Sequence, residues 1–253
     1  MKYLTIWLFI TVSASAATWQ RHVFTPKGDF SDSPAPHPLA YFTQDPFLRD
    51  DGNDFCTSCT PEGKATVHTH HRARTEVQSV GKLQGFAIYD LFYRFDDHID
   101  SGQIDWKSIL VETSPEQYRE IYHLQPTQAE IGPSFFLKAG ADEILVTRDQ
   151  IPGAGNYYYE DYFWFDPGGP VRIDLDPIGQ AVKSILPADS TVWNGGGLNM
   201  ASLTYHMPVW KKGDAHCCPT GGTVDVKLRL DAGRIVVTSK HFDPAADAAR
   251  PFG

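Results

Sequence analysis

The stretch TVDVKLRLDAGRIVVTSKHF, residues 223–242, decides the fold class of this chain. From Val224 to Leu230 every second residue is apolar and the residues between are charged, as in a strand with one packed and one solvated face. The sequence DAG then turns the chain, because Gly233 can adopt a positive φ without steric cost. The returning segment RIVVTSKHF is rich in β-branched residues. The stretch therefore predicts an antiparallel β-hairpin.

Strand-like patterns extend over much of the chain upstream of this hairpin. Apolar and aromatic runs bounded by turn residues predict strands over 65–77, 85–97, 107–113, 142–147 and 156–166. The segment EQYREIYHL, residues 116–124, fits either a strand or a short helix. One helix is predicted over 176–187, with Asp176 as N-cap and Pro177 at its first position. The expected fold class is therefore α+β and β-dominated, with antiparallel sheets, one short covering helix and a C-terminal hairpin.

The N-terminal residues predict export. MKYLTIWLFITVSASA, residues 1–16, has one charge at Lys2, then an apolar run, and ends in the small-x-small pattern Ala-Ser-Ala. The run is shorter than the roughly 20 residues that span a bilayer as a helix. We therefore expect cleavage after Ala16 and a secreted or periplasmic mature protein. The expected organisation is a signal peptide over 1–16, an irregular Pro- and Asp-rich arm over 17–64, a single β-rich domain over 65–243 and a flexible tail over 244–253.

Charge and cysteine content narrow the class of protein. The net charge of −9 argues against nucleic acid or an anionic lipid surface as the main partner, since both require basic patches. Four cysteines in an exported chain predict disulfides: Cys56, Cys59, Cys217 and Cys218. A bridge between two neighbouring cysteines is strained, so we expect the late pair to bond with the early pair. Such bridges would close loops of about 160 residues and stabilise the fold by roughly 4–5 kcal/mol. Two local bridges are the alternative pairing.

A histidine cluster in ATVHTHHRARTEV, residues 65–77, is a candidate metal site. On a strand, His68 and His70 share one face and lie about 7 Å apart at the backbone, while His71 points to the other face. Two such imidazoles can bind zinc or copper if a third ligand comes from elsewhere in the fold. The arginines at 72 and 74 weigh against a metal. The alternative is a solvated strand face.

The aromatic strand NYYYEDYFWFD, residues 156–166, is a candidate binding surface. Tyr158, Tyr162 and Trp164 would share one strand face, and rows of Tyr and Trp can bind glycans. Glu160 and Asp166 lie too far apart on an extended strand for a glycosidase acid pair. The alternative is that the aromatic side chains pack both faces of a central strand.

Two other acidic positions attract attention. Asp90 lies on the apolar face of GFAIYDLFYRFDD, residues 85–97, which predicts an ion pair or hydrogen bond from a neighbouring strand. In WKKGDAHCCPTGG, residues 210–222, Asp214 and His216 lie beside the cysteine pair. Because bridged cysteines are the expectation in an exported chain, this loop predicts a structural rather than a nucleophilic role.

The C-terminal part also shows a resemblance. The order YFWFD, then GP, a short helix ending in LP, then CCPTGG before a terminal hairpin resembles exported bacterial proteins of uncharacterised function. This resemblance spans about the last hundred residues and implies an exported globular protein, with no activity or site residues attached.

Taken alone, the sequence predicts an exported binding protein rather than an enzyme. No complete catalytic constellation can be assembled from its motifs. The expected ligand is a small molecule, a glycan or another component of the cell envelope. The alternative function is a metal-binding protein or a metal-dependent hydrolase that uses zinc or copper at His68 and His70; otherwise no cofactor is expected.

Overall fold

The computed structural model describes residues 35–43, 73–95, 106–124, 130–151, 157–192, 197–215 and 218–246. Strands dominate it and every strand pairing is antiparallel, which confirms the predicted fold class. The helices are α1 (Leu39–Phe42) and α2 (Asp176–Lys183). The strands are β1 (Ala73–Leu83), β2 (Phe86–Phe95), β3 (Trp106–Ser114), β4 (Gln117–Leu124), β5 (Glu130–Ile131), β6 (Phe135–Ala139), β7 (Asp142–Ile151), β8 (Tyr157–Asp166), β9 (Gly169–Arg172), β10 (Ser190–Thr191), β11 (Leu198–Asn199), β12 (Thr204–Pro208), β13 (Trp210–Lys211), β14 (Thr223–Asp231) and β15 (Arg234–Asp243).

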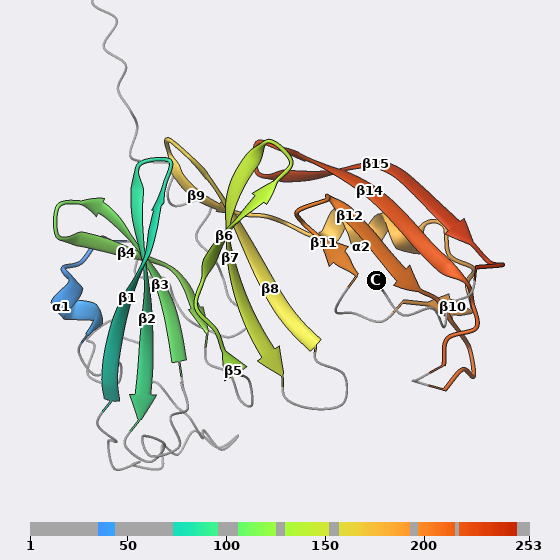
Figure 1. The fold of residues 1–253 in the computed structure, drawn as a ribbon, viewed down its shortest axis with the longest axis horizontal. Coiled ribbons are helices and arrows are strands. Elements are labelled where there is room, and N and C mark those ends of the chain that lie inside the picture. Colours follow the sequence, from blue (N-terminus) through green and yellow to red (C-terminus); the bar gives the residue numbers. More distant parts are fainter. Residues whose placement is uncertain are drawn as a thin grey trace, which may run out of the picture.

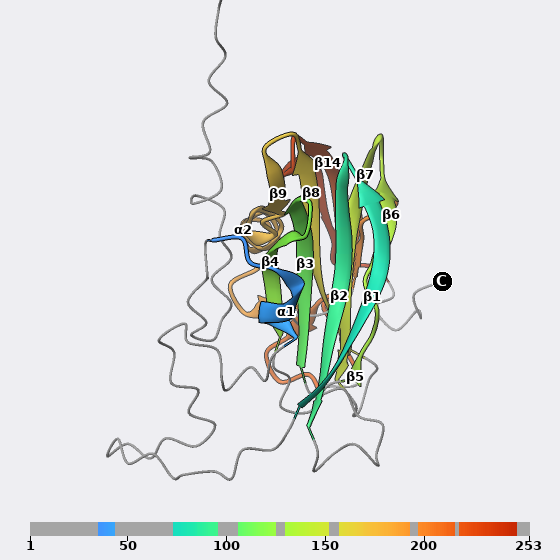
Figure 2. The same cartoon turned by 90° about the vertical axis from the view of Figure 1, so that its left-hand side faces the viewer.

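The strands form three main sheets. The first sheet has the order β1-β2-β3-β4, and the central sheet has the order β5-β7-β8-β9, with β6 also paired to β7. The C-terminal sheet has the order β11-β12-β14-β15, and β10 and β13 form a separate pair. The three sheets follow one another along the long axis of the molecule (Figure 1). Seen from the end, the first sheet stands in front of the strands of the other two (Figure 2).

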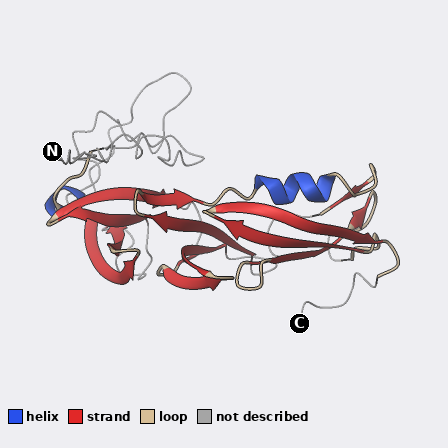
Figure 3. Cartoon of the chain, turned by 90° about the horizontal axis from the view of Figure 1, so that it is seen from above, coloured by secondary structure: helices blue, strands red, loops and turns tan. Residues whose placement is uncertain are grey.

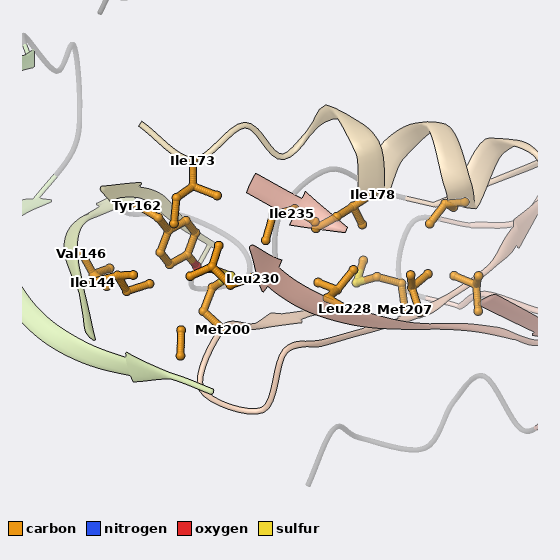
Figure 4. Packing of buried hydrophobic residues seen from close by; sticks show 14 of the residues in the cluster. Ile144, Val146, Tyr162, Ile173, Ile178, Met200, Met207, Leu228, Leu230 and Ile235 are labelled. Atoms are coloured by element: carbon orange, nitrogen blue, oxygen red, sulfur yellow. The ribbon is translucent and has the colours of Figure 1, made fainter. Parts of the chain in front are cut away.

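The central sheet is buried on both faces, which explains its runs of consecutive apolar residues. Leu145 and Phe163 point into a core shared with the first sheet. Their neighbours Ile144 and Tyr162 point the other way, into a core shared with α2 and the C-terminal sheet (Figure 4). Because successive side chains on a strand alternate in direction, a strand between two cores needs apolar residues at both parities.

The segment that was predicted to be an irregular arm contains a short helix. Residues of α1 pack on the outer face of the first sheet, where Phe42 is 1% exposed. The hydroxyl of Tyr93 donates to the carbonyl oxygen of Phe42 over 3.0 Å, and His37 forms a β-bridge with Tyr118. This part of the arm is therefore tied to the first sheet.

The predicted helix forms, but its boundaries and cap differ from expectation. Helix α2 lies along one face of the C-terminal sheet (Figure 3) and buries Ile178, Ala181 and Val182. Leu175, not Asp176, is the N-cap residue, because Asp176 already has helical geometry and its N–H is satisfied by the Asp174 carboxylate at 2.9 Å. The helix ends at Lys183, and the apolar residues up to Pro187 continue in turns.

The predicted hairpin is confirmed as β14 and β15. Its two-residue turn has φ of 48° at Ala232 and 76° at Gly233. A Cβ on Gly233 would lie 2.9 Å from the Trp164 ring, so this position also requires the close approach that glycine permits. The pairing also contains a β-bulge that was not predicted. Thr238 is the extra residue, since Val237 and Ser239 pair with consecutive residues of β14 and Thr238 has no register partner.

The other predicted strands also form, within a few residues at their ends. The segments predicted over 85–97, 107–113, 142–147 and 156–166 appear as β2, β3, β7 and β8. The ambiguous segment 116–124 is the strand β4. For the segment predicted over 65–77, the structure describes only the part from Ala73, which opens β1. Among the described residues, no helix is long and apolar enough to cross a membrane.

Candidate functional site

The aromatic side chains of β8 that the structure describes, from Tyr162 to Phe165, lie largely in the core. Tyr162 is 2% exposed, and Trp164 is half-buried against the same cluster. The backbone of Tyr158 pairs with Gln150, while its side chain is outside the described part. Of the three residues predicted to form a binding surface, two thus pack between the central and C-terminal sheets. This arrangement follows the alternative interpretation, in which the aromatic residues fill both faces of a central strand.

Glu160, on the same strand, is held in a fixed ion pair. Arg148 donates through Nε to the Glu160 carboxylate over 2.6 Å, and the Tyr162 hydroxyl donates to its second oxygen. Burial first, and then this hydrogen bond, raise the pKa of Tyr162 far above its ordinary value of 10.0. The hydroxyl therefore stays protonated and anchors Glu160. The next acid along, Asp161, is bound by Arg172 of β9. The contacts of both acids are those of structural ion pairs.

Asp90 is the centre of a buried polar network between the first and central sheets. Its carboxylate accepts hydrogen bonds from the Ser134 N–H at 2.6 Å and the Ser134 hydroxyl at 2.7 Å. The Lys107 ammonium lies 3.6 Å from the same carboxylate, with both side chains at most 1% exposed. Lys107 also donates to the Gly132 carbonyl at 2.8 Å and the Thr147 hydroxyl at 3.0 Å. The expectation of an ion pair from a neighbouring strand is confirmed.

This network joins four elements of the chain. Asp90 comes from β2, Lys107 from β3, Thr147 from β7, and Ser134 from the link between β5 and β6. Each charge therefore meets partners of the opposite polarity, as buried charges require. With full burial and complete pairing, the network is suited to fixing how the two sheets pack rather than to meeting a substrate.

A second cluster resembles a catalytic triad in composition but not in geometry. Ser108 lies 2.9 Å from His123 Nδ1, and the Glu120 carboxylate lies 3.2 Å from that same nitrogen. A serine–histidine–acid relay needs the hydroxyl and the acid on opposite ring nitrogens. Ser108 is also fully buried. The three residues therefore position a buried histidine beside the Trp106 ring rather than activate a nucleophile.

The loop around Asp214 has a structural role. Its carboxylate accepts hydrogen bonds from the N–H groups of Lys211 at 2.7 Å and Thr220 at 2.9 Å, and from the Thr220 hydroxyl. The backbone hydrogen bond from Lys211 is the largest cause of a lowered pKa for Asp214. This acid thus closes the loop that carries Cys218, which is disulfide-bonded. The other three cysteines, Cys56, Cys59 and Cys217, lie outside the described residues. The partner of Cys218 is therefore not described, and the predicted pairing stays a prediction.

The histidines that sequence reasoning favoured, His68 and His70, lie outside the described residues. A different pair is described on the C-terminal sheet. His206 of β12 lies directly opposite Asp225 of β14, with Nδ1 2.6 Å from a carboxylate oxygen and the side chains 45% and 51% exposed. His241 of β15 lies opposite Asp225 on its other side. Three neighbouring strands therefore place His, Asp and His in one exposed row.

This row belongs to a larger polar surface, the outer face of the C-terminal sheet. Strand register assigns fourteen residues to it: Asn199, Thr204, His206, Pro208, Thr223, Asp225, Lys227, Arg229, Asp231, Arg234, Val236, Ser239, His241 and Asp243. Twelve of them are exposed or half-buried and Pro208 and Thr223 are buried, whereas the opposite parity of β14 is buried throughout, against α2. As the side chains stand, no group of three in the described part of the chain is placed to hold a metal ion.

Comparison with protein-family models, with curated proteins and with solved structures returned no match.

Proposed function

We propose that this chain is an exported, non-enzymatic binding protein whose ligand is a component of the cell envelope. The binding surface would be the outer face of the C-terminal sheet. The observation that carries this proposal is the polar, solvent-facing row of His206, Asp225 and His241, which is presented by three paired strands. Side chains on a rigid sheet lose little backbone freedom on binding, which favours recognition by a preformed surface.

The composition of this surface narrows the ligand. Its charged residues have both signs, Asp225 against Lys227 and Arg229, and its other members are mostly hydroxyl, amide and imidazole groups. Val236 is its one apolar residue that is not buried. Such a face suits a polar or charged partner bound through hydrogen bonds and ion pairs, rather than an apolar molecule or a sugar stacked on aromatic rings.

A cosedimentation assay tests the proposal. The mature protein would be mixed with isolated envelope from its own cells, and the bound fraction measured against salt concentration. Replacing Asp225, Lys227 and Arg229 together by alanine should abolish binding, because all three project from the proposed surface. The control replaces Lys138 and Glu143, an exposed register pair on β6 and β7, and should leave binding unchanged. Equal binding by both variants would refute the assignment of the surface.

Metal binding is the second candidate function. It is favoured by the types of side chain in the row, since two imidazoles and a carboxylate are common zinc and copper ligands; because these side chains are not placed to hold an ion as they stand, binding would require them to rotate toward one another. His68 and His70 remain the candidates from the sequence, also for a metal-dependent hydrolase. Elemental analysis of untagged exported protein, before and after zinc loading, tests this function. Loss of bound metal on His206→Ala but not on His68→Ala would assign it to the C-terminal sheet, and the reverse result would assign it to the histidine cluster.

A further inference from the structure

The C-terminal sheet ends in a long strand whose outer edge is open. β15 spans Arg234–Asp243 and pairs on one side with β14; in the described part of the chain no strand pairs with its other side. Arg234 and the run from Thr238 to His241 are exposed, so much of the strand meets solvent. An open edge of this length offers a row of backbone donors and acceptors to another strand.

The backbone groups that face outward can be assigned from the hairpin. The N–H of Leu228 on β14 donates to Leu203 on the β12 side over 2.8 Å, so the odd-numbered residues of β14 bond to β15. Their partners on β15 include Val236 and His241. The alternate residues of β15 therefore direct their N–H and C=O groups away from β14: Ile235, Val237, Lys240 and Phe242.

The bulge makes this edge complementary to itself. We propose that two copies of the chain pair through β15, antiparallel, about a twofold axis between Thr238 and Ser239. In this register Ile235 lies opposite Phe242 of the partner subunit, and Val237 lies opposite Lys240 of the partner subunit. These are the residues whose backbone groups face outward, so each opposed pair can exchange two hydrogen bonds.

Side-chain direction and charge agree with the same register. In a regular strand, pairing about a point between two residues would place side chains of opposite faces against each other. Thr238 is an extra residue, so the alternation shifts by one and each pair shares a face. Ile235 and Phe242 both belong to the α2 side and pack against its core cluster. At the two ends, Arg234 lies opposite Asp243 of the partner subunit, which gives two ion pairs of opposite charge.

A bulge and an edge lysine can also keep an edge strand from pairing. Here Lys240 already has a contact within its own subunit, because its ammonium donates to the Ser184 hydroxyl over 2.6 Å. It would therefore lie beside Val237 of the partner subunit without losing that contact. The pairing is closed by twofold symmetry and would join two C-terminal sheets into one, with their outer faces on the same side.

Sedimentation velocity on the full mature chain, at concentrations up to about 1 mM, tests the proposal. The wild-type chain should form a dimer. Lys240→Pro removes an outward N–H that β14 does not use and should abolish the dimer, while Lys240→Ala keeps the N–H and should retain it. A monomer at every concentration would overturn the proposal, and so would a dimer that Lys240→Pro leaves unchanged.

Charge reversal tests the register itself and does not depend on the proline variant folding. Arg234→Asp or Asp243→Arg alone should weaken the dimer about tenfold or more, because each places like charges opposite each other twice. The double variant restores two opposite-charge pairs and should recover most of the affinity. Arg229→Asp, one strand further from the edge, is the matched control and should leave the dimer unchanged. Failure of the double variant to recover, with both single variants folded, would overturn this register.

Discussion

Replacement of one partner in the Asp90–Lys107 pair should be among the most destabilising single changes in the described part of the chain. Lys107→Met removes the ammonium and keeps much of the side-chain volume. Asp90 would then remain as a carboxylate that is 1% exposed and 3.6 Å from where its counter-charge was. Loss of one partner of a buried ion pair costs about 3–5 kcal/mol. That is a large share of the roughly 5–15 kcal/mol that stabilises a typical domain.

The double variant separates the charge effect from simple loss of contacts. Asp90→Asn keeps one oxygen that can accept from Ser134 and replaces the other by an amide nitrogen that cannot, so it removes the charge and one of the two acceptors. Combined with Lys107→Met, it leaves no unpaired charge, so the remaining cost is that of Gly132 and Thr147 without their donor and of one Ser134 donor without its acceptor, about 1–3 kcal/mol for each group. The double variant should therefore lose less stability than the sum of the two single changes, with a coupling free energy of up to about 3 kcal/mol.

Urea unfolding followed by fluorescence and circular dichroism measures these differences, with midpoints compared at constant slope. If a single variant does not fold, Thr147→Val gives a milder test. It removes one acceptor of the ammonium, 3.0 Å away, and should cost about 1–3 kcal/mol. A cost below about 1 kcal/mol for Lys107→Met, or strict additivity in the double variant, would refute the conclusion that this pair is desolvated and coupled.

Four further predictions concern pH and the backbone. Burial raises the pKa of Tyr205 to about 12, so above pH 10 the unfolded chain loses the hydroxyl proton before the folded chain does. The urea midpoint of unfolding should therefore fall as pH rises above 10, and Tyr205→Phe should reduce that fall. Asp214 has a lowered pKa, so its contribution to stability should be complete above pH 3.8 and fade at lower pH. Asp214→Ala should abolish hydrogen-exchange protection of the Thr220 amide at neutral pH. Protection that the substitution leaves unchanged would contradict the role of Asp214 in closing the loop. Gly179 lies in α2 with an ordinary helical φ, and a Cβ at this position would meet no atom within 4 Å, so Gly179→Ala should raise stability by about 0.5–1 kcal/mol in thermal unfolding. Gly222→Ala should do the opposite, because φ is +94° and the added Cβ would collide with the Asp243 carbonyl.

Local patterns predicted the secondary structure well where one physical signal dominated. The hairpin over 223–242 combined strict alternation with a glycine turn, and both strands and the turn formed as expected. Asp90 among apolar residues correctly implied a buried partner. The identity of that partner could not be predicted, because Lys107 sits near the start of a strand where a lysine is ordinarily solvated. Only pairing of β2 with β3 and packing on β7 makes its site a buried one.

The short helix α1 was not predicted, for a different reason. Its four residues, LAYF, lie in a segment rich in proline and aspartate, and no helical periodicity can be read over a single turn. It forms because Phe42 fills a space on the first sheet, which is a tertiary cause. The cap of α2 was misplaced by one residue for a local reason, since Asp174 satisfies the first free N–H from outside the helix.

The row of His206, Asp225 and His241 was missed because of the bulge, and the sequence did contain a signal for it. Counting outward from the Asp231–Arg234 closing pair without a bulge would put Asp225 opposite Lys240 and would turn Phe242 to the solvent. The apolar positions Ile235 and Val237 have the opposite parity to Phe242, so a strand that buries all three must change phase between them. The extra residue Thr238 makes that change, and it moves His241 to the outer face beside Asp225. Thr238 therefore produces both the exposed row and the self-complementary edge of β15. A dimer through β15 would present the row of His206, Asp225 and His241 twice on one continuous face.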